Sequence, residues 1–223
     1  MTRPCRYIFG FRPVLWDVRF AWLVGFVGAV YKYSIIPATP INKRAPALIM
    51  RLTIDHNVVI DLANQSPNVN RLRQLMEDGT HQVHVVEIGA SEMRKRGIRP
   101  DRYDLFEQLL HEASLDTAPR LAPMMIWDVT FWDHGLWSDE QMIAKAKMIE
   151  DVLFGESPAV GITGELDGSP KVLNRICDVQ SIWCHLHYRN EIFVSSDRNF
   201  HKATKLPRLL ELGAGRIALP EVL

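Results

Sequence analysis

Cysteine is scarce in this chain. Its 223 residues include three cysteines, Cys5, Cys177 and Cys184, and their spacing does not suggest a disulfide framework. This scarcity excludes the class of small secreted domains that disulfides hold together. A reducing, cytoplasmic setting is therefore expected for the main body of the chain.

The chain also lacks a net charge, since 26 Lys and Arg balance 26 Asp and Glu. Residues 1–49 hold seven Lys or Arg and one acid, a balance of +6, whereas residues 50–223 hold 19 and 25, a balance of −6. This distribution disfavours a protein that holds nucleic acid through overall positive charge. A site built from several carboxylates fits the acidic balance, and so do ordinary surface acids.

Apolar runs of bilayer-spanning length are missing too. The run Phe20–Tyr31 has twelve uncharged residues, which is too few to cross a membrane. A longer stretch, residues 14–36, would contact a membrane if the charged end of Lys32 extended to the membrane surface. Prolines between residues 37 and 46 then mark a linker. Three interpretations of residues 1–49 stay open: a non-native leader, a membrane-contacting tail, or a cleaved signal peptide.

Residues 50–223 alternate between strand and helix patterns, and 47% hydrophobic residues suffice for a sizeable core. Strands are expected at residues 51–54, 82–88, 191–195 and 215–219. Helices are expected at residues 58–63, 69–78, 90–96, 102–114, 138–154, 170–188 and 206–212. Ser138 is expected to cap the fifth helix, and a break near Asn174 in the sixth stays open. This order predicts an α/β fold with a central parallel sheet flanked by helices.

Four acidic residues are expected at one rim of this sheet. Asp55 and Asp197 follow strands, Glu92 opens a helix after the second strand, and Asp178 lies on the helix that precedes the strand at 191–195. Ligands of such sheets bind at the carboxyl ends of the strands, where the strand order reverses. A single Asp at such a junction is more often a helix cap than a ligand, so the four acids count only as a set.

Phosphodiester hydrolysis is a reaction that uses such a set. It requires a lower pKa for the attacking water and stabilisation of charge on the phosphate oxygens. Mg²⁺ and Mn²⁺ do both, and they prefer oxygen ligands. Carboxylates supply these oxygens, and Asn57 would add a neutral ligand or orient a carboxylate.

Three stretches of the chain resemble, in order and spacing, the motifs of PIN-domain proteins. Each places an acid next to a hydrophobic strand. The stretches are Leu52–Leu62 with Asp55-His56-Asn57, Val83–Val86 with Ala90–Met93, and Asp178 with Ile192–Phe200. His56 stands where the family often has Thr, which removes a hydroxyl and leaves the carboxylates in place.

This resemblance implies a PIN-like three-layer sandwich and a metal-dependent endoribonuclease that hydrolyses RNA with Mg²⁺ or Mn²⁺. The acids it implies for metal binding and catalysis are Asp55, Glu92, Asp178 and Asp197, with Asn57 and Ser195 in support. Many members of the family are the toxin of a toxin–antitoxin pair. RNA, an antitoxin protein and a second copy of the chain are therefore the expected partners.

Some of these assignments have competitors within the sequence. Residues 98–169 are longer than the compact toxins need, which predicts an inserted helical segment. Glu87 competes with Glu92 for the second acid, and Asp61 competes with Asn57 for the supporting role. Asp178 would lie deep in its helix if that helix begins at Pro170 without a break.

The basic run after the second acid has two interpretations. Arg94, Lys95 and Arg96 are either contacts to an RNA backbone or solvated charges. The sulfurs of Cys177 and Cys184 would lie ~10 Å apart on one helix face, too far for a single zinc ion, so buried thiols are expected.

Three tryptophans, Trp127, Trp132 and Trp137, lie among acids rather than basic residues. Base stacking usually has basic neighbours, so packing within the inserted segment is the expectation. Beside the nuclease, two further hypotheses stay open. One is a non-catalytic PIN-like module that binds RNA or a protein, and the other is an interaction protein tethered to a membrane by residues 14–36.

Overall fold

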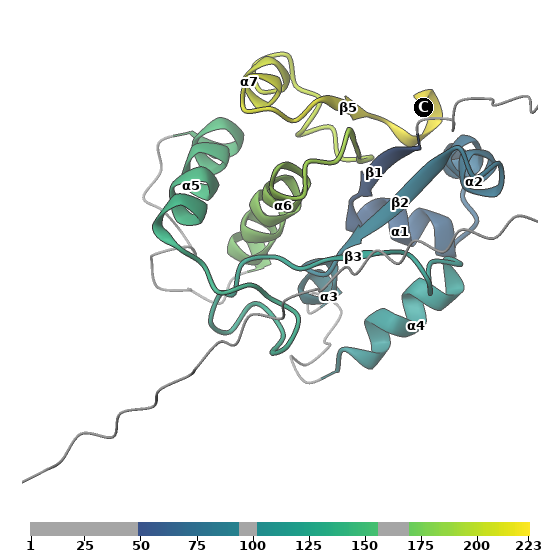
Figure 1. Ribbon diagram of the computed structural model, residues 1–223, viewed down its shortest axis with the longest axis horizontal. Coiled ribbons are helices and arrows are strands. Elements are labelled where there is room, and N and C mark those ends of the chain that lie inside the picture. Colours follow the sequence, from purple (N-terminus) through teal and green to yellow (C-terminus); the bar gives the residue numbers. More distant parts are fainter. Residues whose placement is uncertain (1–48, 94–101, 156–169) are drawn as a thin grey trace, which may run out of the picture. The chain divides into compact units, whose positions relative to one another are not determined.

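Five parallel strands form one central sheet in the order β3-β2-β1-β4-β5 (Figure 1). The computed structural model describes residues 49–93, 102–155 and 170–223, all within one compact unit, Arg44–Leu223. The strands are β1 Met50–Ile54, β2 His81–Val86, β3 Arg120–Leu121, β4 Ile192–Val194 and β5 Arg216–Ala218. The predicted α/β fold with a central parallel sheet is confirmed.

The strand order reverses at β1, which lies in the middle of the sheet. From β1 the chain builds β2 and β3 on one side and then returns to build β4 and β5 on the other. Leu52 pairs with Val83 of β2 and with Ile192 of β4, so β1 is hydrogen-bonded along both edges. The carboxyl ends of β1 and β4 therefore flank the point where ligands bind in open α/β sheets.

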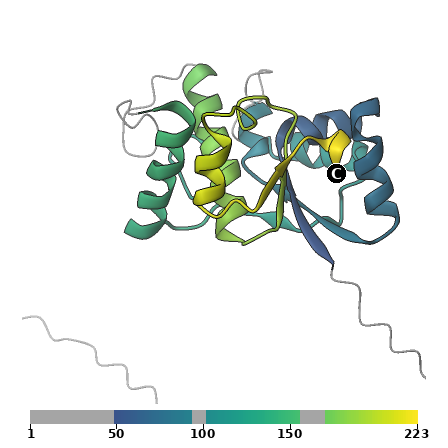
Figure 2. The same cartoon turned by 90° about the horizontal axis from the view of Figure 1, so that it is seen from above.

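Helices cover both faces of the sheet, which makes a three-layer sandwich (Figures 1 and 2). The first face carries α1 His56–Ala63, α2 Asn70–Glu77 and α4 Asp104–Glu112. The second face carries α5 Glu140–Phe154, α6 Pro170–His187 and α7 Leu206–Glu211. The remaining elements are the short α3 Gly89–Glu92 and the 3-10 turns η1 Pro67–Val69 and η3 Pro220–Val222.

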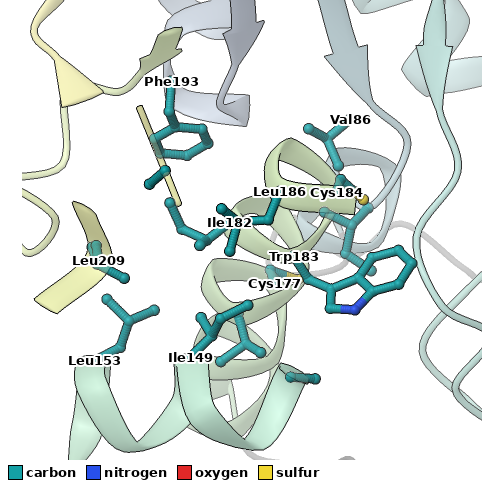
Figure 3. Close-up of a cluster of buried hydrophobic side chains, with 14 of the residues drawn as sticks. Val86, Ile149, Leu153, Cys177, Ile182, Trp183, Cys184, Leu186, Phe193 and Leu209 are labelled. Carbon is teal, nitrogen blue, oxygen red and sulfur yellow. The ribbon is translucent and has the colours of Figure 1, made fainter. Parts of the chain in front are cut away.

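Strand alternation divides the apolar side chains between these two faces. Ile192 and Val194 of β4 pack with the α1 side, whereas Phe193 between them packs against α6 (Figure 3). Trp183 of α6 is 1% exposed. Complete burial of a side chain of this kind contributes about 1.5–3 kcal/mol, so α6 is held firmly against the sheet.

Helix α6 runs unbroken from Pro170 to His187, so the break near Asn174 does not occur. Cys177 and Cys184 of this helix are buried free thiols, as expected (Figure 3). Among the described residues, no helix combines the length and apolar character needed to cross a membrane. Residues 14–36 lie outside the described residues.

The described part of the predicted insertion belongs to the fold itself. Arg120–Leu121 form the edge strand β3, which the sequence interpretation missed because two residues show no alternation. Helix α5 packs against α6. Its cap is Asp139, whose carboxylate accepts the Met142 N–H at 2.8 Å, so the assignment of Ser138 as the cap was wrong by one residue.

Candidate functional site

Asp55 joins the central strand to the first helix. Its backbone N–H donates to the Val194 carbonyl at 3.0 Å, which extends the contact between β1 and β4 by one residue. Its carboxylate accepts the His56 N–H at 2.9 Å and caps α1. Asp55 is therefore the helix cap that its position predicts, and the rest of its surroundings decide whether it is more than a cap.

Side chains from three elements fix the Asp55 carboxylate. Ser195 Oγ donates to Oδ2 at 2.8 Å, Asn57 Nδ2 donates to the same oxygen at 2.9 Å, and Ser181 Oγ of α6 donates to Oδ1 at 3.3 Å. The Asn57 carbonyl oxygen in turn accepts the Ser196 N–H at 3.1 Å. Asn57 and Ser195 thus orient the Asp55 carboxylate, and their supporting role at a metal site stays a prediction.

All four predicted acids line one pocket of about 360 Å³ at this rim of the sheet. Asp55 follows β1, Glu92 ends α3, Asp178 comes from the middle of α6, and Asp197 follows β4. The full lining is Asp55, His56, Asn57, Ile60, Glu92, Asn174, Asp178 and Asp197. We call this cavity the acid pocket. It lies where the strand order reverses, as the topology requires for a ligand site.

Burial and like charge both act on Asp55. The residue is 5% exposed, and loss of solvation raises the pKa of its carboxyl, as does the negative charge of Asp197. The hydrogen bonds from Ser195 and His56 oppose this rise without cancelling it. An ionised Asp55 is therefore incompletely compensated by the protein groups around it.

Asp197 is held in a similar way. Its carboxylate accepts the Asn199 N–H at 2.7 Å, and its own N–H donates to Ser195 Oγ at 3.0 Å. Ser195 therefore touches both acids that follow strands. One hydroxyl fixes their relative position.

Two further residues at this site escaped the sequence interpretation. Asn174 precedes Asp178 by one helical turn and lines the same pocket, and its buried Oδ1 has no hydrogen-bond partner among the described residues. Lys205 donates to Asn199 Oδ1 and to the Leu153 carbonyl. Burial lowers the pKa of Lys205, while Asp178 and Asp197 act to raise it. The four-residue spacing of Asn174 and Asp178 was a usable signal, whereas Lys205 had none.

Close packing at Gly89 brings α3 to the acid pocket. A Cβ atom at this position would lie 2.9 Å from His56 Nδ1 and 3.1 Å from the Phe106 ring. Glycine lets α3 approach α1 at this distance, and Glu92 lies three residues further along the same short helix. The placement of Glu92 thus depends on a residue without a side chain.

The competing acids lie elsewhere. Glu87 accepts the Tyr103 hydroxyl at 2.9 Å and contacts His134 Nδ1 at 3.1 Å, and it does not line the acid pocket. Asp61 accepts the Ser196 hydroxyl at 3.1 Å and the Asn68 amide at 2.7 Å. Of these competing residues, Glu92 and Asn57 line the acid pocket, and Glu87 and Asp61 do not. Arg94, Lys95 and Arg96 lie outside the described residues.

The donor set fits a hard cation by its chemistry. Four carboxylates and two side-chain amides supply only oxygen ligands of the kind that Mg²⁺ and Mn²⁺ prefer, and the buried Asn174 oxygen has a vacant acceptor position. Within residues 49–93, 102–155 and 170–223, no group of three or more His, Cys, Asp or Glu is arranged to hold a metal ion directly. Mg²⁺ sites commonly use one or two carboxylates and several waters, which suits this spacing.

No family model, curated protein or solved structure matches the chain.

Proposed function

We propose that the acid pocket is the active site of a metal-dependent endoribonuclease. The observation that carries this proposal is the meeting of Asp55, Glu92, Asp178 and Asp197, from four separate elements, in one pocket at the reversal of strand order. Asp55 is the buried member of this set, and its carboxylate is held by hydroxyl, amide and backbone donors. The raised pKa of Asp55, which burial and then Asp197 cause, fits a site completed by a cation.

The chain's own residues would position the cation and the RNA phosphate. Mg²⁺ or Mn²⁺, when bound, supplies a water of lowered pKa and stabilises charge on the phosphate. Asp55 and Asp197, fixed through Ser195, would contribute one or two direct ligands to the cation, and Glu92 and Asp178 would hold its waters. Lys205, beside Asn199 at the edge of these acids, would attract the phosphate of an RNA backbone.

The test uses the full chain with generic structured and single-stranded RNAs, in Mn²⁺ and in EDTA. We expect cleavage in Mn²⁺ only, with Asp55→Asn and Asp197→Asn lowering its rate about 1000-fold or more, because several kcal/mol of transition-state stabilisation are lost. The matched control is Asp151→Asn, which removes an exposed acid of α5 and should leave the rate unchanged.

Two acidic variants sharpen the assignment of the second acid. Glu92→Gln should lower the rate strongly, whereas Glu87→Gln should have its main effect on stability through Tyr103. Metal-independent cleavage, or no cleavage across varied RNAs, would contradict the proposal.

A second candidate is a PIN-like module that binds RNA or a protein without cutting. Both oxygens of Asp55 already accept hydrogen bonds, and among the described residues no three ligands are arranged around a metal ion, which favours this alternative. RNA binding without cleavage in Mn²⁺ would select it. The antitoxin partner, the homodimer and the cytoplasmic location stay predictions from the sequence.

A further inference from the structure

Three tryptophans stand out on the surface of the segment between β3 and α5. Trp127 is 71% exposed, Trp132 59% and Trp137 76%. The expectation that they pack within the segment was therefore wrong. Large aromatic side chains gathered in water usually mark an interaction site, because they leave apolar surface unburied. We call residues 122–139 the tryptophan loop.

The backbone of the loop presents these rings side by side. The tryptophans recur every five residues, and Asp128 and Asp133, which follow the first two, have positive φ values of 59° and 67°. Aspartate tolerates this left-handed conformation better than most residues. The Trp127 and Trp132 rings meet edge to face at 5.4 Å, and Trp132 meets Trp137 at 6.3 Å. The cluster is thus ordered by ring contacts.

A second pocket, of about 370 Å³, opens beside this cluster. Its lining is Met125, Ile126, Trp127, Asp128, Thr130, Phe131 and Trp132. The walls are mostly apolar and aromatic, with one carboxylate. The pocket shares no residue with the acid pocket, so its function is separable from catalysis.

The tryptophan loop is anchored on elements that also carry the acids. Ser91, next to Glu92 on α3, donates its hydroxyl to the Val129 carbonyl at 2.6 Å. The Met124 N–H donates to Gln180 Oε1 of α6 at 3.0 Å, and both residues are largely buried. A pocket held at both ends in this way loses little conformational entropy on binding.

We propose that the tryptophan loop is a docking surface for a basic peptide segment of a partner protein, with a Lys or Arg side chain entering the pocket that Trp127 and Trp132 line. The aliphatic stem of such a side chain fits the apolar wall, and its charged head suits indole faces and a carboxylate. Trp and Arg are also the residues that contribute most binding energy at protein interfaces.

Charge argues against RNA as the occupant. The loop contains three acids, Asp128, Asp133 and Asp139, and no Lys or Arg. Surfaces that stack bases normally provide positive charge for the phosphates, and this loop would repel them. The same acids attract a basic peptide and steer its approach.

The test measures binding of a labelled peptide of alternating Arg and Ser to the full chain, with a Glu–Ser peptide and oligouridylate as comparisons. We expect the Arg–Ser peptide alone to bind at this loop, more weakly at higher salt. Trp127→Ala and Trp132→Ala should each weaken binding about tenfold or more. Leu210→Ala removes an exposed apolar side chain of α7 and should leave the affinity unchanged.

Further variants separate the loop from the acid pocket. Asp128→Asn should lower the affinity and its dependence on salt, whereas Asp197→Asn should leave both unchanged. The proposal is overturned if the peptide does not bind, if its affinity depends on Asp197 and not on the tryptophans, or if Trp132→Ala abolishes oligouridylate binding. Unchanged thermal midpoints of Trp127→Ala and Trp132→Ala would show that the loss of binding is local.

Discussion

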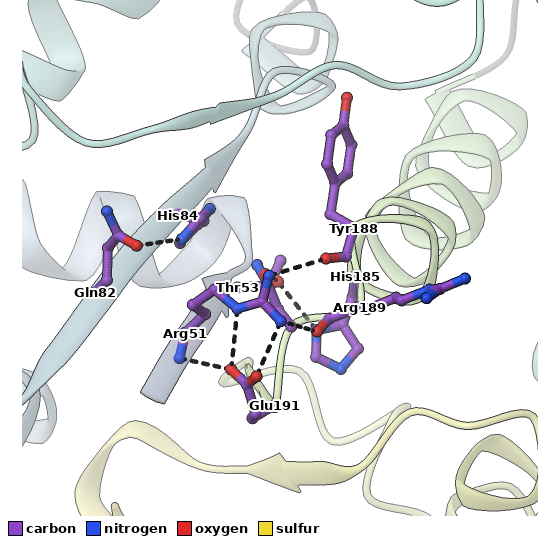
Figure 4. A network of polar contacts seen from close by, with 9 residues as sticks. Arg51, Thr53, Gln82, His84, His185, Tyr188, Arg189 and Glu191 are labelled. Atoms are coloured by element: carbon purple, nitrogen blue, oxygen red, sulfur yellow. Dashed lines mark hydrogen bonds and ion pairs between the residues drawn. The ribbon is translucent and has the colours of Figure 1, made fainter. Parts of the chain in front are cut away.

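Two polar clusters begin two residues apart, at Thr53 on the central strand and at Asp55 just after it, and they differ in charge. Thr53 belongs to the first, in which His185 Nδ1 lies 3.0 Å from the Thr53 hydroxyl (Figure 4). Asn190 Nδ2 donates to the same hydroxyl at 2.8 Å. Asp55 belongs to the second, the acid pocket. Both clusters contact α6, so they share a scaffold and differ in charge.

The first cluster carries no charge, and the Thr53 hydroxyl and both ring nitrogens of His185 have hydrogen-bond partners, whereas the buried Asn190 Oδ1 has none among the described residues. His185 Nε2 lies 2.9 Å from the Ala214 carbonyl, which can only accept, so this nitrogen carries the proton and Nδ1 accepts from Thr53. Burial lowers the pKa of His185 to about 4, which keeps the ring neutral. Beside it, Arg51 and Glu191 form a half-exposed ion pair at 2.9 Å (Figure 4), which contributes little.

The acid pocket shows the opposite arrangement. Four acids line it, and the pKa of Asp55 is raised, by burial first and by Asp197 second. Asp55 is buried and the other three acids are partly exposed, and burying a carboxyl beside a like charge costs free energy of folding. The comparison separates an uncharged cluster that belongs to the fold from an acidic one, for which we propose a ligand.

The largest expected difference is in the response to pH. The folded pKa of His185 is depressed from 6.5 to about 4, so its contribution is fully present above pH 6.5 and is lost as the pH falls towards 4. The loss amounts to about 3 kcal/mol. The raised pKa of Asp55 has the opposite effect on stability. Protonated Asp55 favours the folded state, so its contribution is present at low pH and is lost as the pH rises through the folded pKa.

Urea unfolding between neutral pH and about pH 4 measures this contrast. His185→Gln should flatten the loss of stability on acidification, and the exposed His111→Gln should retain it. If His185→Gln lost stability on acidification as steeply as the wild type, His185 would not be the cause of the loss.

The response to a divalent cation should be nearly as large. Mn²⁺ at a hundredfold excess over its Kd should raise the free energy of unfolding by about 2.7 kcal/mol. Asp55→Asn should lose this response and should melt higher than the wild type in EDTA, because it removes an incompletely compensated charge. Thermal melts with and without Mn²⁺ test both points. An equal response in Asp55→Asn and Asp151→Asn would show that the cation binds elsewhere.

Removal of one hydroxyl from each cluster gives a matched pair. Ser195→Ala should lower metal affinity or cleavage about 10–100-fold, as the loss of a group that orients a ligand does. Thr53→Val should leave cleavage nearly unchanged and lower stability by about 1–3 kcal/mol, since His185 and Asn190 lose a buried partner. Cleavage and unfolding are measured in parallel for both variants. If Thr53→Val lowered cleavage and Ser195→Ala lowered only stability, the roles assigned to the two clusters would be reversed.

The smallest expected effect is that of Gly89→Ala. The added methyl would meet His56 Nδ1 at 2.9 Å and force α3 outwards, which should lower stability by about 1–2 kcal/mol. Because Glu92 moves with α3, we also expect metal affinity to fall. Gly79→Ala is the comparison, since nothing lies within 4 Å of its added methyl although its φ of 64° strains it. An unchanged metal affinity in Gly89→Ala would uncouple α3 from the acid pocket.

The sequence was sufficient to predict a residue's position wherever nearby residues in the chain determine that position. Asp55 and Asp197 follow apolar strands, so their place at one rim could be predicted from strand ends alone. The choice between Glu87 and Glu92 could not, because it depends on Tyr103 and His134, which lie far along the chain. The four-residue spacing of Asn174 and Asp178 was a usable signal, and the unbroken α6 places both residues on one helix face.

The sequence by itself determined the alternation of strands and helices, and with it the parallel sheet and the acids at its rim. The tertiary structure alone decided which polar groups meet across the sheet and which aromatic rings stay in water. Trp183 is buried because α6 lies against the sheet, whereas Trp132 is 59% exposed on a loop whose Val129 and Met124 are anchored to α3 and α6. Hydrophobic periodicity is a local property, while burial depends on contacts between distant segments.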